Sequence, residues 1–61
     1  TLENSVGREG VCNKAITKDL PGEIEIEGEI WIAYSKSTIQ VGDKVKIIAQ
    51  KSLNLQVQKE D

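Results

Sequence analysis

The side chains that could act as nucleophiles are one cysteine, Cys12, and four serines, with Lys36 lying between Ser35 and Ser37. A nucleophilic thiol needs a depressed pKa and a neighbouring base, and the sequence contains no histidine to supply one. A serine nucleophile would need a Gly-x-Ser-x-Gly elbow or an oxyanion-hole motif, and the sequence has neither. We therefore predict that this chain is not an enzyme, and that Cys12 is a buried structural thiol.

Four glutamates alternate along one short segment, at Glu23, Glu25, Glu27 and Glu29. In an extended strand the first three project from one face, about 7 Å apart. Hard cations need several oxygens that converge, whereas a row along a twisted strand diverges. The glutamates therefore predict a solvated face that discourages edge-to-edge pairing, and we expect no metal or cofactor site. The single cysteine also excludes an internal disulfide and a multi-thiolate zinc site.

Composition indicates a small all-β domain, because 13 of the 61 residues are Ile or Val and β-branched side chains suit a pleated sheet. Eight basic residues stand against ten acidic ones, which is a poor electrostatic match to a phosphate backbone, so we expect no nucleic-acid partner. The chain has no run of about 18 apolar residues, so this fragment contains no direct membrane span.

The segment from Gly22 to Ser35 alternates apolar and polar residues on both sides of Gly28, which predicts a β-hairpin. A two-residue loop at Gly28-Glu29 would form a type II′ turn. It pairs Ile26 with Trp31. Residues directly opposite share a face, so the inner face is expected to hold Ile24, Ile26, Trp31 and Ala33.

The outer face of this hairpin is the candidate partner surface, consisting of Ile30, Ile32, Tyr34, Glu23, Glu25 and Glu27. The three apolar members occupy consecutive outward positions of one strand, which makes a stripe. Two explanations stay open: the stripe is an interaction surface, or β-propensity selected these residues or the Gly7 region folds over them. Trp31 could serve as a base-stacking platform, but the register turns it towards the core.

A second hairpin is expected from Asp43 to about Lys59, with a three-residue loop at Gln50-Lys51-Ser52. This loop pairs Ile47 with Leu55 and leaves Ile48 outward unless a bulge intervenes. It places six apolar residues on one face: Val45, Ile47, Ala49, Leu53, Leu55 and Val57. All of these except Ala49 join the inner face of the first hairpin in the predicted core, which consists of Ile24, Ile26, Trp31, Ala33, Val45, Ile47, Leu53, Leu55 and Val57.

Before the first hairpin, the segment Gly7 to Lys18 alternates less clearly. Either Val11, Ala15 and Thr17 face inward or Cys12 and Ile16 do, and a bulge would reconcile the two patterns. Five strands with little or no helix suit a Greek-key OB-type barrel, which removes most exposed edges by closing on itself. The predicted domain covers residues 7–58, with a flexible tail or linker at 1–6 and a frayed end at 59–61.

Six short motifs occur in a fixed order along the chain: Gly7-x-x-Gly10, Leu20-Pro21-Gly22, Ile24-x-Ile26-x-Gly28, Trp31-x-Ala33-x-Ser35, Ile39-x-x-Gly42-x-x-Val45 and Leu53-x-Leu55. In this order they resemble the C-terminal soluble domain of the NfeD family. The resemblance implies a five-stranded OB-type barrel that is held at the membrane by N-terminal transmembrane segments absent from this sequence.

The same resemblance implies a function. NfeD proteins act with stomatin- or flotillin-like proteins that carry the SPFH domain, so the implied role is a noncatalytic protein-interaction module, with self-association as a further possibility. Long family members add a serine protease domain, and nothing in this sequence resembles it. The unpaired cysteine favours a reducing, cytoplasmic location. The alternative function for such a barrel is binding single-stranded nucleic acid.

Overall fold

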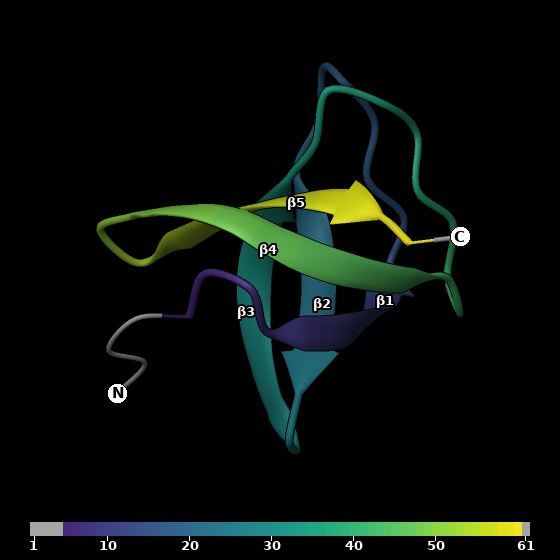
Figure 1. Ribbon diagram of the computed structural model, residues 1–61. Helices are drawn as coiled ribbons and strands as arrows, with labels where there is room; N and C mark the ends of the chain where they lie inside the picture. The colour runs from purple at the N-terminus through teal and green to yellow at the C-terminus, as the bar shows by residue number, and fades with distance from the viewer. Residues whose placement is uncertain (1–4, 61) are drawn as a thin grey trace.

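The computed structural model describes residues 5–60, which form five strands (Figure 1). The strands are β1 (Glu9–Lys14), β2 (Gly22–Ile26), β3 (Glu29–Tyr34), β4 (Lys44–Lys51) and β5 (Asn54–Lys59). They close into a barrel in the order β1-β2-β3-β5-β4, and no residue from 5 to 60 is helical. The prediction of an all-β, five-stranded OB-type barrel is confirmed. The predicted chain ends at residues 1–4 and 61 lie outside the described residues.

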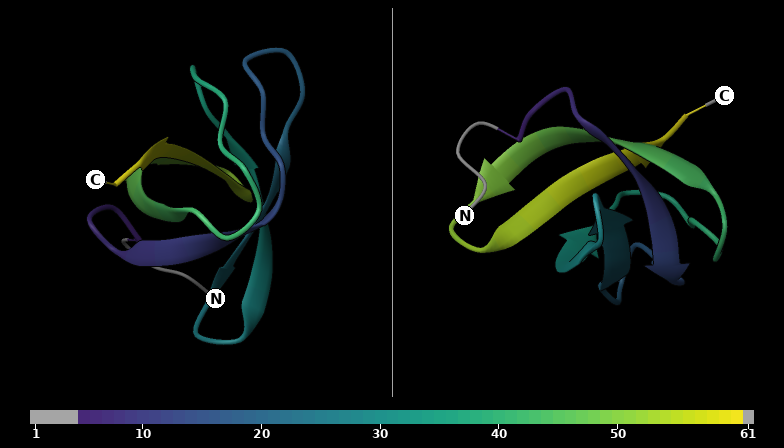
Figure 2. Two further views of the ribbon diagram at one scale, coloured as in Figure 1. Left: turned by 90° about the vertical axis from the view of Figure 1, so that its right-hand side faces the viewer. Right: turned by 90° about the horizontal axis from the view of Figure 1, so that it is seen from below.

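Most neighbouring strands in the barrel are antiparallel, but β3 and β5 run parallel. Their pairing consists of Ala33 with Leu55 and Tyr34 with Gln56. Figure 2 shows that the β2–β3 hairpin and the β4–β5 hairpin point in different directions. β3 therefore meets β5 at its C-terminal end only.

The β2–β3 turn lies one residue earlier than predicted. Its two central residues are Glu27 and Gly28, with φ of 49° and 85°, and these positive values match a type I′ turn. Ile26 pairs with Glu29 and Ile24 pairs with Trp31. The predicted loop at Gly28-Glu29 is wrong. A two-residue loop at either position leaves the same residues on the inner and outer faces, so the alternation of side chains cannot distinguish the two positions. In the observed turn, Glu27 forms an ion pair with Arg8.

The β4–β5 hairpin also differs from its prediction. β4 runs on to Lys51, the loop is Ser52-Leu53, and the register shifts between Ile47 and Ala49. The later turn by itself would place Ile47 opposite Gln58, and the bulge, which adds a residue to β4, brings Ile47 opposite Val57; the predicted partner was Leu55. The assignment of Leu53 to the core is wrong, because Leu53 lies in the loop with 73% of its surface exposed. The predicted three-residue loop assumes a regular β4, whereas the bulge makes a two-residue loop fit.

The core is built mainly from β-branched side chains that face into the barrel. Beyond the strands, Ile16 and Ile39 bridge two connecting segments and are fully buried. Trp31 packs against the core but is only half-buried, and no acceptor among residues 5–60 pairs with its buried indole N–H. The buried apolar residues are Cys12, Ile16, Ile24, Ile26, Ala33, Ile39, Val45, Ile47, Leu55 and Val57.

The barrel begins earlier than predicted. Ser5 is fully buried, and its hydroxyl donates to Gln50 Oε1 at 2.6 Å. The next turn is tied to β4 by the Gly7 amide, which donates to the Ile47 carbonyl at 2.8 Å. The predicted tail at 1–6 is therefore wrong at Ser5. In β1 itself, Cys12 is buried and Val11 is exposed, and a register shift between Cys12 and Lys14 supplies the bulge.

Replacement of Gly22 should be the most damaging single-methyl change in the hairpins. A Cβ at this position would overlap the backbone carbonyl oxygens of Lys14 and Ala15, and backbone cannot move aside as a side chain can. We expect Gly22→Ala to lower the free energy of unfolding by about 3 kcal/mol.

The matched control is Gly28→Ala, where a Cβ meets no atom within 4 Å and the cost is the positive φ of 85° alone. That strain amounts to about 1 kcal/mol. Urea unfolding followed by circular dichroism compares the two variants. Equal losses in the two variants would show that β1 and β2 are not packed this closely.

Candidate functional site

The apolar stripe on the outer face of β3 consists of Ile30, Ile32 and Tyr34, called here the β3 stripe. Each of these side chains is 44–48% exposed, so the Gly7 region does not fold over them. The stripe differs from the other exposed apolar residues, such as Ile48 on β4 and Leu20 in a loop, because its members occupy three consecutive outward positions of one strand. Contiguous apolar surface of this kind marks interaction sites more often than scattered residues do.

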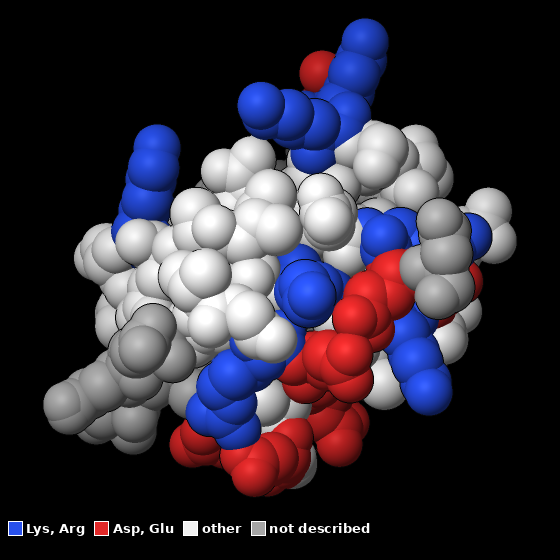
Figure 3. All heavy atoms as spheres, in the orientation of Figure 1, with Lys and Arg blue, Asp and Glu red and all other residues white. Residues whose placement is uncertain are grey.

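The neighbouring outer face of β2 is acidic. Glu25 lies directly opposite Ile30, and Glu23 lies directly opposite Ile32. Glu27 follows in the turn, where it pairs with Arg8. These three carboxylates are called here the acidic row. Figure 3 shows acidic side chains gathered over the lower part of the molecule, where Figure 1 places the β2–β3 hairpin.

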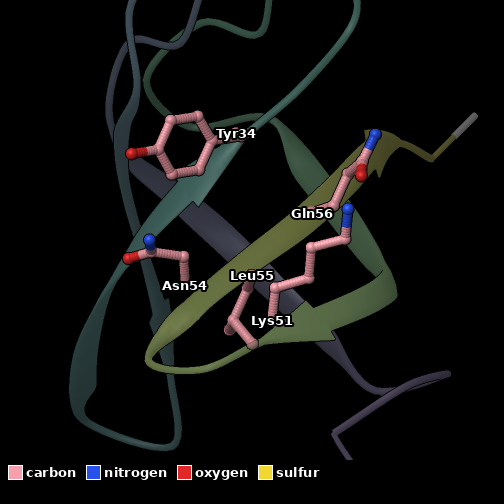
Figure 4. Close-up of a pocket in the computed structure, with 5 residues that line it drawn as sticks. All are labelled: Tyr34, Lys51, Asn54, Leu55 and Gln56. Atoms are coloured by element: carbon pink, nitrogen blue, oxygen red, sulfur yellow. The ribbon is translucent and has the colours of Figure 1, made fainter.

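A shallow pocket of about 230 Å³ lies next to the β3 stripe, between the end of β3 and the β4–β5 hairpin (Figure 4). Its walls come from Tyr34, Lys51, Asn54, Leu55 and Gln56. Small-molecule sites usually have volumes of about 300–1,000 Å³, so this pocket is better suited to single side chains of a partner. No pattern in the sequence predicts this pocket, because it depends on the observed β4–β5 turn and on the parallel pairing of β3 with β5.

Cys12 and Ser35, two of the side chains considered for catalysis, are engaged in structural contacts. The Cys12 thiol is buried and donates to the Lys14 carbonyl at 3.2 Å. Burial raises the pKa of Cys12, and this effect outweighs the lowering by the hydrogen bond with Lys14. The buried Ser35 hydroxyl accepts from the Ser37 amide at 3.1 Å, so its partner is not a base. Within residues 5–60, no group of three or more Cys, Asp or Glu side chains is placed to hold a metal ion.

Cys12 should therefore resist modification while the protein is folded. We expect iodoacetamide at about pH 8 to react roughly 100-fold or more slowly with the native protein than with the protein in urea, since reaction requires opening of the barrel. Mass spectrometry of the adduct gives both rates. Similar rates in the two conditions would place the thiol at the surface.

The raised thiol pKa also predicts a pH dependence of stability. The folded state keeps the Cys12 proton to a higher pH than the unfolded chain does. The stabilisation is complete below the ordinary thiol pKa and is lost as the pH rises through the folded-state pKa. Cys12→Ala should therefore lose less stability than the parent between about pH 8 and pH 10. If the parent and Cys12→Ala lose the same stability over this pH range, ionisation of Cys12 does not contribute to the pH dependence.

Comparison with known proteins gives one family match. The family described as "NfeD-like C-terminal, partner-binding domain" matches residues 2–59. The uncharacterized protein MJ0826 of Methanocaldococcus jannaschii is 39% identical over 57 residues, which cover 93% of this chain and 41% of that protein. The chain thus spans about two fifths of the length of this relative. Within residues 5–60, no helix is long and apolar enough to cross a membrane.

Two solved structures share the barrel. The C-terminal domain of stomatin operon partner protein 1510-C from Pyrococcus horikoshii superposes with a TM-score of 0.86 at 30% identity, covering 100% of this chain and 95% of that one. The soluble domain of a membrane protein implicated in regulation of membrane protease activity, from Corynebacterium glutamicum, gives a TM-score of 0.83 at 25% identity. It covers 93% of this chain and 94% of that one.

Proposed function

This chain belongs to the NfeD family, and from that premise we propose that it is a noncatalytic interaction module whose docking surface is the β3 stripe with the acidic row beside it. The observation that carries the proposal is the pairing of Ile30 with Glu25 and of Ile32 with Glu23 on an exposed face. A partner would bury apolar side chains at the centre of such a surface and meet carboxylates at its rim, the usual layout of a protein interface.

The energetics agree with a compact docking site. Burying a whole isoleucine side chain contributes about 1.5–3 kcal/mol. Ile30 and Ile32 are about half exposed in the free protein, so each could add about 1 kcal/mol on binding. Tyr34 adds a ring of larger area with a polar tip, and tyrosine is enriched at the centres of interfaces.

The proposed partner is a stomatin- or flotillin-like protein with an SPFH domain. Support comes from the Pyrococcus horikoshii domain, which is named as part of a stomatin operon partner protein. The Corynebacterium glutamicum domain is named as the soluble part of a membrane protein. We accordingly propose that transmembrane segments on the N-terminal side hold the full-length protein at the membrane, with this domain on the cytoplasmic face. A second copy of the barrel is the other proposed occupant of the surface.

The decisive experiment compares Ile32→Lys with Ile48→Lys in binding to a purified stomatin-like protein with an SPFH domain. Both residues are exposed isoleucines in strands, at 47% and 41%. Both variants should remain folded because outward strand positions tolerate a charge. We expect Ile32→Lys to weaken binding at least about tenfold, and Ile48→Lys to stay within about twofold.

Amide spectra of each variant report the fold, and isothermal titration reports binding. Equal effects of the two variants on affinity would remove the β3 stripe from the proposal. If the parent protein does not bind, the proposed SPFH-domain partner is wrong. Sedimentation of the parent protein alone would then test self-association.

We also expect no useful binding of single-stranded DNA or RNA at physiological salt. Acidic side chains occupy the outer faces of β2 and the β2–β3 turn, and binding of this kind depends on counterion release by basic side chains. Fluorescence anisotropy of a labelled oligonucleotide measures it. Micromolar affinity that weakens steeply with added salt would favour the nucleic-acid function instead.

A further inference from the structure

Four of the six residues of β3 have a neighbouring strand on one side only. β2 pairs with β3 from Glu29 to Ala33, while β5 pairs only with Ala33 and Tyr34. Among the residues that the structure describes, no strand lies beside Glu29–Ile32 on the side away from β2, called here the β3 edge. In Figure 1, β4 and β5 cross the upper part of β3, and the β2–β3 hairpin continues below them.

The turn determines which backbone groups point out of the β3 edge. In a hairpin with a two-residue loop, the pair that flanks the loop exchanges hydrogen bonds, and bonded pairs then alternate with non-bonded ones. Ile26 and Glu29 flank the loop, and Ile24 pairs with Trp31, so Glu29 and Trp31 direct their N–H and C=O groups towards β2. Ile30 and Ile32 direct theirs away from β2. The two residues with outward apolar side chains are thus the same two whose amides face the β3 edge.

We propose that the β3 edge takes up an extended segment of the protein partner as a sixth strand, and that this segment alternates apolar with basic side chains. The proposal rests on the proposed function and specifies how its docking surface binds. Strand addition supplies affinity through main-chain hydrogen bonds and specificity through alternate side chains. The amides of Ile30 and Ile32 are the donors, and the Ile30 carbonyl is the acceptor.

The charges beside the edge select basic side chains. The acidic row lies on β2, one strand beyond β3, so about 10 Å separates it from an added strand. A lysine or arginine on that strand can lay its aliphatic stem over Ile30 or Ile32 and bring its cationic head towards Glu25 or Glu23. The same basic side chains then cover the apolar surface with their stems and pair with the carboxylates through their charged ends.

The shape of the edge favours one strand over a second barrel. The β3 edge ends at the pocket lined by Tyr34, Lys51 and Asn54 (Figure 4), where the β4–β5 hairpin begins to project. A single segment can run along the edge and place one side chain in this pocket. A second copy would bring its own projecting hairpin and its own acidic row to the same edge, so steric overlap and like charge oppose it.

Hydrogen exchange of the individual amides tests the proposal. In the free domain, the Trp31 amide should be protected by β2, and the Ile30 and Ile32 amides should exchange rapidly. The probe is a capped eight-residue peptide of alternating lysine and valine, with alternating glutamate and valine as the matched control. We expect the lysine peptide to slow exchange at Ile30 and Ile32 at least about tenfold, with no change at Trp31 and no effect of the glutamate peptide.

Proline substitution separates the backbone from the side chain. Ile30→Pro removes an amide that faces the edge and leaves the bonds to β2 intact, a position that edge strands tolerate, while Ile30→Thr removes similar apolar area and keeps the amide. We expect Ile30→Pro to abolish binding of the lysine peptide and Ile30→Thr to retain it within about fivefold. If Ile30→Pro does not fold, the hydrogen exchange of the parent protein with and without the lysine peptide still tests strand addition.

The outcomes separate this proposal from the proposed function. If the SPFH-domain protein binds and depends on Ile32, while exchange at Ile30 and Ile32 is unchanged in both complexes, strand addition is wrong and the docking surface stands. Protection of these amides by protein concentration alone would show that a second copy occupies the edge, and would overturn the choice of a partner segment. Protection by the lysine peptide without any binding of the SPFH-domain protein would support the edge and reject that partner.

Discussion

Closure of the barrel depends on one short contact, the parallel pairing of Ala33 with Leu55 and of Tyr34 with Gln56. Without it, the β1–β2–β3 meander and the β4–β5 hairpin would meet only through β1 and β4. Ala33 and Leu55 are fully buried at this contact, so the core is sealed where the two halves of the sheet join. A domain of this size buries only about 60% of the surface that its unfolded chain exposes, so the loss of this contact would be serious.

The short pairing of β3 with β5 also explains why the outer part of β3 is exposed. Because β5 pairs with β3 only at the end of the strand, the remaining four residues of β3 extend beyond the closed part of the barrel and keep one free side. Alternation then places Ile30 and Ile32 outward while Trp31 packs inward against the core. The like charges of the β2 glutamates would oppose the pairing of two such edges. In the proposed function, stability and docking therefore depend on opposite faces of one strand.

Much of the architecture could be predicted from residue alternation. Moving a two-residue turn by one position leaves the alternation of faces unchanged. Alternation therefore predicts correctly that Ile24, Ile26 and Ala33 are buried, although it predicts the β2–β3 loop one residue too late. It fails at a bulge, because one extra residue reverses the pattern. The bulge near Ile48 therefore moved Leu53 from the expected core to an exposed loop.

The rest depended on contacts between distant parts of the chain. Nothing local marks Ser5 as buried, since its hydrogen bond is to Gln50. Ile39 is buried where its connecting segment forms a β-bridge with the segment that holds Ile16. The pocket next to Tyr34 and the free side of β3 both follow from the parallel pairing with β5. The alternation within the β2–β3 hairpin does not show which strand lies on the other side of β3. Part of the site was therefore visible in the sequence as outward side chains, while the backbone edge was not.

The measurement that tests the central claim most directly is chemical-shift mapping of the isotopically labelled domain during titration with an unlabelled SPFH-domain protein. If β3 is the docking element, the largest changes will fall on the amides of residues 29–34 and on Glu23 and Glu25 beside them. The outer face of β4 around Lys44, Lys46 and Ile48 will change little. Changes concentrated on β4, with β3 unaffected, would contradict the account.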